Sequence, residues 1–126
     1  MTPASWTQAL ALNVCRQLEA IAPRFGAHVA LTGGCLYKLG PRKDLDVVFY
    51  RIRQVSHIDV DGLMEAIRVI GIKPGDDFGW CYKATYLTRD IDFFFPEREG
   101  VEAPGYGPPR SEADAQADKY VGEPIE

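Results

Sequence analysis

Residues 44–50, Asp-Leu-Asp-Val-Val-Phe-Tyr, restrict the fold of this chain more than any other segment. Two acids open the segment, and from Val47 onward every side chain is apolar or aromatic. Successive side chains of a strand point to opposite faces, so this strand carries apolar residues on both of its faces. Such a pattern is typical of a strand in the interior of a sheet. We therefore predict a central strand here, with acids at its beginning.

Two helices are predicted from apolar residues that recur every three or four positions. The first spans about residues 5–23 and begins with the spacing of a capping box, Ser5 followed by Gln8. The second spans residues 60–70, where an aspartate at position 59 or 61 can cap it and Gly71 can end it. The apolar stripe of each helix should pack against the core.

The remaining regular elements are short. Residues 27–32 are expected to form a buried strand that ends at Gly33-Gly34, followed by a helical turn through residues 36–39. Residues 78–86 and 90–95 are rich in aromatic and β-branched side chains and predict an antiparallel hairpin. This order of elements predicts an α/β (α+β) fold with a small mixed β-sheet and helices packed on one side.

The composition divides the chain into two parts. We expect residues 1–96 to form one minimal domain and residues 97–126 to form an acidic, Pro- and Gly-containing tail with a short helix near residues 111–120. The tail carries three basic and eight acidic side chains, a balance of −5, so residues 1–96 sum to +1 within the total of −4. A general polyanion-binding protein is therefore excluded.

The cationic side chains gather in one part of the sequence. Between residues 36 and 53, five basic side chains face two acids, a balance of +3; the five are Lys38, Arg42, Lys43, Arg51 and Arg53. Three cysteines without a Cys-x-x-Cys spacing support neither a disulfide framework nor a zinc site. No apolar run approaches the roughly 20 residues that cross a bilayer. We expect a cytoplasmic protein without a membrane segment.

Asp44 and Asp46 are the first candidate site residues. They lie two apart on one strand, so their carboxylates share a face, with Cα atoms roughly 7 Å apart. Two carboxylates side by side repel each other unless a counter-charge is present. Carboxylate oxygens are ligands that Mg²⁺ prefers, and Mg²⁺ commonly completes its shell with water and phosphate oxygens. The pair predicts a site for Mg²⁺, or Mn²⁺, that acts on phosphates.

Gly33 and Gly34 are the second candidate feature. Without a Cβ, glycines after a strand let backbone N–H groups approach a polyphosphate, and a helix beginning there favours negative charge. We therefore expect a cradle for the phosphates of an NTP. The nearby cations that could neutralise a triphosphate are Lys38, Arg42 and Lys43, with Arg51 further along; ordinary surface charge is the alternative interpretation.

A third acid would complete a site for two metal ions about 3.5–4 Å apart. Asp92 is the preferred candidate because it lies inside an aromatic strand, where an unpaired carboxylate is unfavourable. Asp90 shares its face of the strand and remains the alternative. The predicted catalytic and metal-binding set is therefore Asp44, Asp46 and Asp92.

These motifs resemble the signature of the DNA polymerase β-like nucleotidyltransferase superfamily. The chain has Gly33-Gly34-Cys35, Leu39-Gly40-Pro41 and Lys43-Asp44-Leu45-Asp46 in the order found in the head domain of CCA-adding enzymes and bacterial poly(A) polymerases, followed by Ile91-Asp92-Phe93-Phe94. The resemblance covers roughly residues 27–95. It implies a polymerase β palm-like fold, two Mg²⁺ ions on the three acids, and an NTP triphosphate on the glycine loop.

The chain departs from that pattern in two places. Tyr37-Lys38 stands where those enzymes carry an Arg-Asp pair, and the downstream helical domains that hold tRNA are absent from this sequence. We therefore expect a metal-dependent enzyme that transfers NMP from an NTP to a hydroxyl of an RNA such as tRNA, a protein or a small molecule. A protein partner could supply acceptor recognition. The alternative is an inactive nucleotidyltransferase-like binding protein, such as an antitoxin or an inhibitor of a partner protein.

Overall fold

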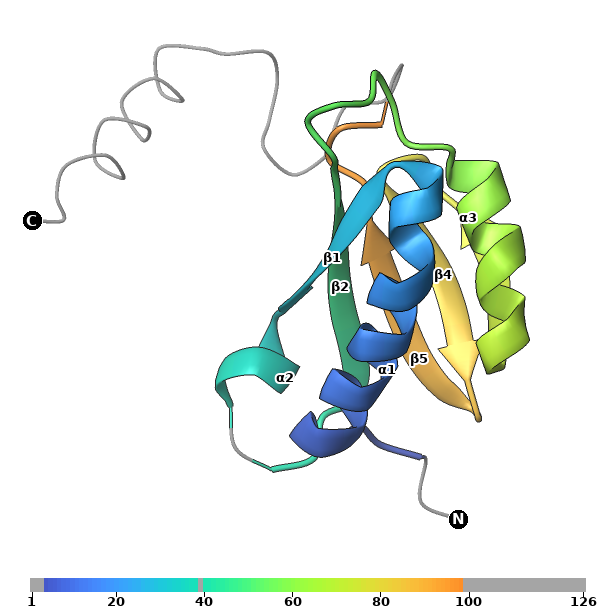
Figure 1. Ribbon diagram of the computed structural model, residues 1–126. Helices are drawn as coiled ribbons and strands as arrows, with labels where there is room; N and C mark the ends of the chain where they lie inside the picture. The colour runs from blue at the N-terminus through green and yellow to red at the C-terminus, as the bar shows by residue number, and fades with distance from the viewer. Residues whose placement is uncertain (1–3, 39, 99–126) are drawn as a thin grey trace, which may run out of the picture.

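A computed structural model describes residues 4–38 and 40–98. They form a five-stranded mixed sheet of order β1-β2-β5-β4-β3, with helices α1 and α3 on one face (Figure 1). The strands are β1 (Ala27–Thr32), β2 (Asp44–Arg51), β3 (Ile72–Asp77), β4 (Cys81–Tyr86) and β5 (Arg89–Phe94). The helices are α1 (Gln8–Ile21), α2 (Gly34–Tyr37) and α3 (Val60–Ala66), with 3₁₀ turns at Ala22–Phe25 and Ile67–Ile70. The predicted fold class is confirmed.

β2 lies inside the sheet, as its sequence predicts. It pairs antiparallel with β1 and parallel with β5, and the other pairings of the sheet are antiparallel. Leu45, Val47 and Phe49 are fully buried, whereas the alternate side chains of β2 are partly or fully exposed. β2 is therefore an interior strand because it has a neighbouring strand on each of its two edges. Within the described residues, the helices cover one face of the sheet.

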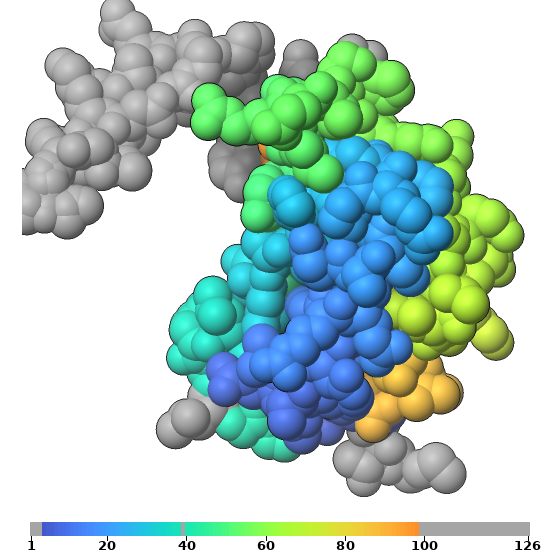
Figure 2. Space-filling view, viewed as in Figure 1, coloured from blue at the N-terminus to red at the C-terminus, as the bar shows by residue number. Residues whose placement is uncertain are grey.

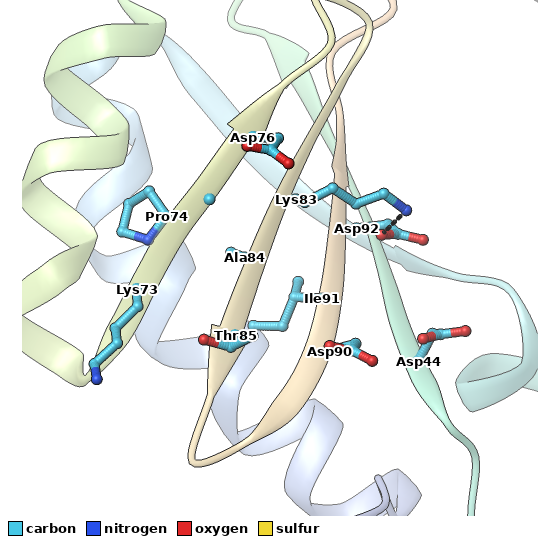
Figure 3. A pocket seen from close by; sticks show the side chains of 11 residues that line it. Asp44, Lys73, Pro74, Asp76, Lys83, Ala84, Thr85, Asp90, Ile91 and Asp92 are labelled. Carbon is cyan, nitrogen blue, oxygen red and sulfur yellow. Dashed lines mark hydrogen bonds and ion pairs between the residues drawn. The ribbon is translucent and has the colours of Figure 1, made fainter.

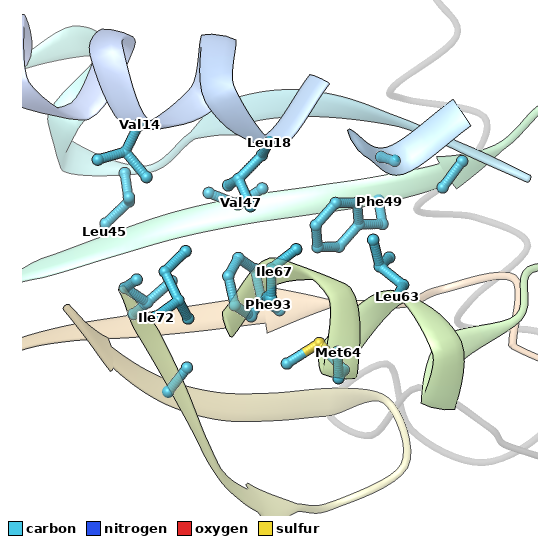
Figure 4. Packing of buried hydrophobic residues seen from close by; sticks show 14 of the residues in the cluster. Val14, Leu18, Leu45, Val47, Phe49, Leu63, Met64, Ile67, Ile72 and Phe93 are labelled. Atoms are coloured by element: carbon cyan, nitrogen blue, oxygen red, sulfur yellow. The ribbon is translucent and has the colours of Figure 1, made fainter. Parts of the chain in front are cut away.

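A single hydrophobic core fills the space between the helices and this covered face (Figure 4). Val14 and Leu18 of α1 and Leu63 of α3 are fully buried there, opposite Phe49 and Phe93 of the sheet. Burying such side chains contributes about 1.5–3 kcal/mol each relative to exposure. Figure 2 shows the helical side from outside, where α1 and α3 lie next to each other over the sheet. The opposite face of the sheet carries the acids and is called the acid-bearing face below.

The first helix begins later than predicted. Thr7, rather than Ser5, is its N-cap, and its hydroxyl accepts a hydrogen bond from the backbone N–H of Leu10. The reason lies in Trp6, whose backbone N–H and C=O both pair with Arg42 at 2.7 Å. A residue paired in this way cannot enter a helix. The helix also ends at Ile21 and passes into a 3₁₀ turn rather than continuing to residue 23.

Other boundaries shift for local reasons. The turn after Gly33 is α2, which begins at Gly34 rather than at residue 36. The second helix begins after Asp59, whose carboxylate accepts from Gly62, but it is α-helical only to Ala66 and becomes 3₁₀ before Gly71. The strand predicted from residue 78 begins at residue 81.

Strand β3 is absent from the sequence prediction. Its sequence, Ile-Lys-Pro-Gly-Asp-Asp, contains residue types that are depleted in strands. It is nevertheless accepted because β3 is the edge strand, and its pairing with β4 is irregular between Pro74 and Asp77. Proline in a sheet is largely confined to edges and bulges.

The hairpin between β4 and β5 turns through two residues, Leu87 and Thr88, because Tyr86 pairs with Arg89. Both turn residues have positive φ, 50° and 66°.

None of the described helices is long and apolar enough to cross a membrane. The predicted acidic tail, including the helix near residues 111–120, lies almost entirely outside the described residues, which end at Arg98.

Candidate active site

Four aspartates lie on two neighbouring strands of the acid-bearing face. The parallel register pairs Asp44 with Asp90 and Asp46 with Asp92. Residues opposite each other in adjacent strands are close neighbours, and residues two apart on one strand share a face. The topology therefore brings together the three acids of the predicted set and their alternative, Asp90. The two members of each pair are 46 positions apart in the sequence.

Asp92 is already engaged with a cation. The Lys83 ammonium on β4 donates to the Asp92 carboxylate at 2.8 Å, and Lys83 is the register partner of Asp92 (Figure 3). The Asp92 side chain is 18% exposed and that of Lys83 is 51% exposed. Sequence reasoning missed Lys83. The expected hairpin left residues 87–89 between its strands, so it did not place position 83 opposite position 92.

The charge balance favours Asp92 over Asp90 as the third acid. The pKa of Asp46 is raised, first by burial and then by the negative charges of Asp92 and Asp44. Asp92 is the register partner of Asp46, whereas Asp90 is opposite Asp44 and its side chain is exposed at the beginning of β5. Of the two acids of β5, Asp92 is thus the one whose negative charge raises the pKa of Asp46.

A cavity of about 460 Å³ adjoins the acids on the acid-bearing face (Figure 3). It extends from Asp44 across β5 and β4 to β3, where Lys73 and Asp76 line its far side. Its lining mixes carboxylates, ammonium groups and the hydroxyl-bearing Thr85. A polar substrate could therefore be bound beside the acids, on the side away from the glycine loop.

The glycine loop touches the acids from the other side. Gly33 has a φ of +72°, and a Cβ built there would overlap the Asp46 carboxylate. A Cβ at Gly34 would lie 2.7 Å from Nε of Arg42. Glycine is thus favoured at position 33 by its backbone conformation and by the nearby Asp46 carboxylate, whereas a Cβ at position 34 would require the Arg42 side chain to shift. The helix that follows, α2, has four residues, so the helix dipole expected from the sequence is that of a single turn.

Side chains from elsewhere hold this loop. The Gln8 amide donates to the carbonyl oxygens of Cys35 and Leu36, each at 3.1 Å. The buried Cys35 thiol donates to the Asp44 carbonyl at 3.5 Å, and burial raises its pKa. Cys35 is therefore a packed side chain that ties the loop to β2.

The three predicted phosphate-binding cations occupy different positions. The side chain of Arg42 lies beside Gly34, and its backbone is fixed by Trp6. Lys38 is exposed, with its ammonium 5.9 Å from the centre of the Tyr37 ring. Lys43 is exposed directly before β2. Of these cations, Arg42 is the one whose contact with the glycine loop is established.

Trp6 contacts both β5 and Arg42, the residue beside the glycine loop. It is fully buried, and its indole N–H donates to the Asp90 carbonyl at 2.8 Å. Its ring stacks with Tyr86 at a centroid distance of 5.9 Å. Through its backbone it also holds Arg42. The sequence pattern assigned Trp6 to a helical stripe and gave no signal for this role.

The site suits a divalent cation by its donor chemistry. Within residues 4–38 and 40–98, no three His, Cys, Asp or Glu side chains are already arranged as a metal site. Asp44, Asp46 and Asp92 nevertheless offer carboxylate oxygens from adjacent strands, the ligands that Mg²⁺ and Mn²⁺ take. Burial, and then the negative charges of Asp92 and Asp44, raise the pKa of Asp46, and a bound cation would favour its ionised form.

Comparison with known proteins supports the fold. No protein-family model and no curated protein matches the chain. Among solved structures, a cytoplasmic RNA terminal U-transferase matches with a TM-score of 0.51 and 17% identity, over 71% of this chain and 27% of that chain. The RNA terminal uridylyl transferase Cid1 gives a TM-score of 0.48 and 17% identity, over 71% of this chain and 30% of its own.

The described domain shares its fold with part of the U-transferase. At 17% identity the likeness concerns the fold, a mixed sheet with helices on one face. This chain corresponds to 27% of the length of that enzyme. The features that enzyme carries in the rest of its length therefore have no counterpart in the match.

Proposed function

We propose that this chain is a metal-dependent nucleotidyltransferase that transfers NMP from an NTP to a hydroxyl of an RNA, a protein or a small molecule. One observation carries the proposal. It is the register of β2 and β5, in which Asp46 is opposite Asp92 and Asp44 opposite Asp90, together with the close approach of the glycine loop to Asp46. Carboxylates next to a close-approach backbone loop are the parts that phosphoryl transfer requires.

In this proposal the residues have separate tasks. Asp44, Asp46 and Asp92 would hold the divalent ions, which neutralise charge on the phosphates and the attacking oxygen when bound. Gly33 would let the loop backbone approach the triphosphate, and Arg42 would neutralise the leaving pyrophosphate. Lys38 and Lys43 would add positive charge at the approach to the loop.

The reaction balances without a further reagent. The acceptor oxygen forms a bond to the α-phosphorus of the NTP, and the bond from that phosphorus to the bridging oxygen of pyrophosphate breaks. The acceptor hydroxyl proton goes to a base, for which we propose the carboxylate of Asp92, a residue that lines the cavity. The cavity on the far side of Asp92 would receive the acceptor.

We further propose that residues 1–96 are the catalytic unit and that acceptor recognition comes from a partner or from the acceptor itself. The match to 27% of the U-transferase supports this proposal, because this chain shares the fold of only part of that enzyme. Residues 97–126 would then lie outside the catalytic unit.

The test is incubation of the full chain with α-³²P-labelled NTPs, Mg²⁺ or Mn²⁺, and total RNA or cell lysate. We expect label in one acceptor class and its loss in the Asp44→Asn/Asp46→Asn double variant. Glu65→Gln is the matched control, since this carboxylate is 76% exposed on α3. Circular dichroism establishes that each variant is folded.

No labelled product from the folded wild type would contradict the proposal. If the folded protein instead captures one stoichiometric protein partner, and the double variant captures it equally well, the inactive binding protein is the correct interpretation.

A further inference from the structure

We propose that Lys83 is an internal counter-cation that competes with divalent metal for Asp92, so that metal binding releases the Lys83 ammonium. This inference deepens the proposed function and rests on it for the metal. The observation behind it is the 2.8 Å ion pair between Lys83 and the carboxylate predicted to complete the metal site. Lys83 would thus be a positioning residue that decides when Asp92 is available.

The fold places this lysine with little freedom in its backbone. β4 pairs with β5 from Cys81 to Tyr86 without interruption, and Lys83 lies opposite Asp92 in that register. The ammonium can therefore leave Asp92 only by rotation of its own side chain. It has room to do so, because the side chain is 51% exposed and lines the 460 Å³ cavity.

The charges make the two cations alternatives. Asp92 is the less exposed member of the pair, at 18%, so the field between its carboxylate and a nearby charge is only partly screened by solvent. A divalent ion bound to the same carboxylate would lie within a few ångströms of the Lys83 ammonium. Two cations at that separation repel each other, and the ion with the larger charge, held also by Asp44 and Asp46, should displace the other.

The pair also explains how the acids are tolerated without metal. The Lys83 ammonium lies 2.8 Å from the Asp92 carboxylate, and Asp92 is the register partner of Asp46. Lys83 thus takes part of the stabilising role that a metal ion would have. When the Lys83 ammonium is removed, the three acids should bind metal more tightly.

The first test follows Lys83 itself. The full chain is acetylated with N-acetoxysuccinimide with and without Mg²⁺, and the rate at each lysine is measured by mass spectrometry. We expect Mg²⁺ to accelerate acetylation of Lys83 about fivefold, the factor that corresponds to loss of a half-exposed ion pair. Lys73, which lines the same cavity from β3, is the internal control and should be unaffected.

Variants separate release from a general effect. Asp92→Asn should make Lys83 react quickly with or without Mg²⁺, and Asp44→Asn/Asp46→Asn should abolish the effect of Mg²⁺. The Lys83→Met variant keeps the aliphatic part of the side chain, and it should bind Mn²⁺ about tenfold more tightly by calorimetry. Binding by Lys83→Met alone, without binding by the wild type, would mean that the metal does not displace Lys83 and would contradict the proposal.

Two further outcomes would overturn the inference, and they differ in what else they overturn. If Mn²⁺ binds the wild type and needs Asp44 and Asp46, but Lys83 acetylation does not change with Mg²⁺, Lys83 is not displaced and the proposed function stands. If neither the wild type nor Lys83→Met binds Mn²⁺ and no label is transferred from NTP, both proposals fail.

Discussion

The carboxylate of Asp46 occupies the space that a side chain at Gly33 would fill. The contact follows from the sheet, because Thr32 at the end of β1 pairs with Asp46 in β2 and Gly33 comes next in the chain. The loop that would hold phosphates and the acid that would hold metal are thus in direct contact. A change in one must move the other.

Replacing Gly33 with alanine should therefore remove activity as well as stability. The φ of +72° is unfavourable for alanine, and the new methyl group would displace Asp46. We expect a loss of about 2 kcal/mol in the free energy of unfolding, measured by urea denaturation, and NMP transfer reduced at least about a hundredfold. Gly40→Ala is the control, since Gly40 has a φ of +87° but open space around its Cβ position. Equal activity losses in both variants would contradict the role of the contact.

Replacing Asp46 with asparagine should stabilise the metal-free protein at neutral pH. The pKa of Asp46 is higher in the folded than in the unfolded chain, so its ionised form is disfavoured by folding. The wild type is thus relatively stable below the unfolded pKa and loses this stability as pH rises through the folded pKa. The gain of Asp46→Asn should appear at pH 7 in EDTA and vanish near pH 3. Asp90→Asn, at an exposed position, should show a smaller gain; an equal gain would contradict the assignment of burial as the cause.

Replacing Trp6 with phenylalanine should lower the free energy of unfolding by removing a contact that supports the site. The indole N–H bond to the Asp90 carbonyl is lost, which costs about 1 kcal/mol, while most of the buried ring is kept. Trp6→Ala should cost about 3–5 kcal/mol. Denaturation followed by the fluorescence of the remaining tryptophan measures both. Trp80→Phe, which keeps an aromatic ring against Phe94, is the control and should cost less.

The β4–β5 turn should be open to improvement. Leu87 and Thr88 both have positive φ, which suits glycine and asparagine better than a β-branched residue. Replacing Leu87-Thr88 with Asn-Gly should raise the free energy of unfolding by about 1 kcal/mol. Thermal denaturation would show an increase in Tm. A decrease would mean that these side chains contribute contacts that outweigh the backbone strain.

The ion pair of Arg98 with Asp77 should stabilise the end of the described chain. The guanidinium donates to both carboxylate oxygens, at 2.7 and 3.0 Å, and holds the pKa of Asp77 below its usual value. Arg98→Met should cost about 1 kcal/mol at pH 7. Because the folded pKa is lowered, this contribution is present above the unfolded pKa and is lost as pH falls through the folded one. Arg68→Met, which removes an exposed pair with Glu65, should have almost no effect at either pH.

The elements of the fold that could be predicted are those whose own sequence pattern indicates which side chains are buried. β2 has apolar residues on both faces after its two acids, and α1 has a regular apolar stripe, so both follow from local pattern. β3 could not be predicted, because its pairing depends on an edge position that the local sequence does not encode. Trp6 left its predicted helix for the same reason: its partner, Arg42, is distant in the chain.

The candidate site was predictable where motif and strand pattern coincide. The acids of β2 and β5 and the two glycines stand in short local motifs, and the structure brings Asp44, Asp46 and Asp92 together as expected. The supporting contacts were not predictable, because Gln8 and Lys83 act through backbone register and loop position. A single glutamine or lysine carries no signal of such a contact in sequence.

The parallel pairing of β2 with β5 has a consequence for how the protein is made. Antiparallel neighbours can form as a hairpin soon after both strands exist, but β2 must wait for β5, with α3, β3 and β4 between them in the chain. Contacts between distant residues form slowly because a long loop must close first. During synthesis from the N-terminus, Asp44 and Asp46 therefore leave the ribosome before Asp92, and the three acids come together only when β5 pairs with β2. An assembled cluster of these acids is thus a feature of the completed sheet and not of its N-terminal half.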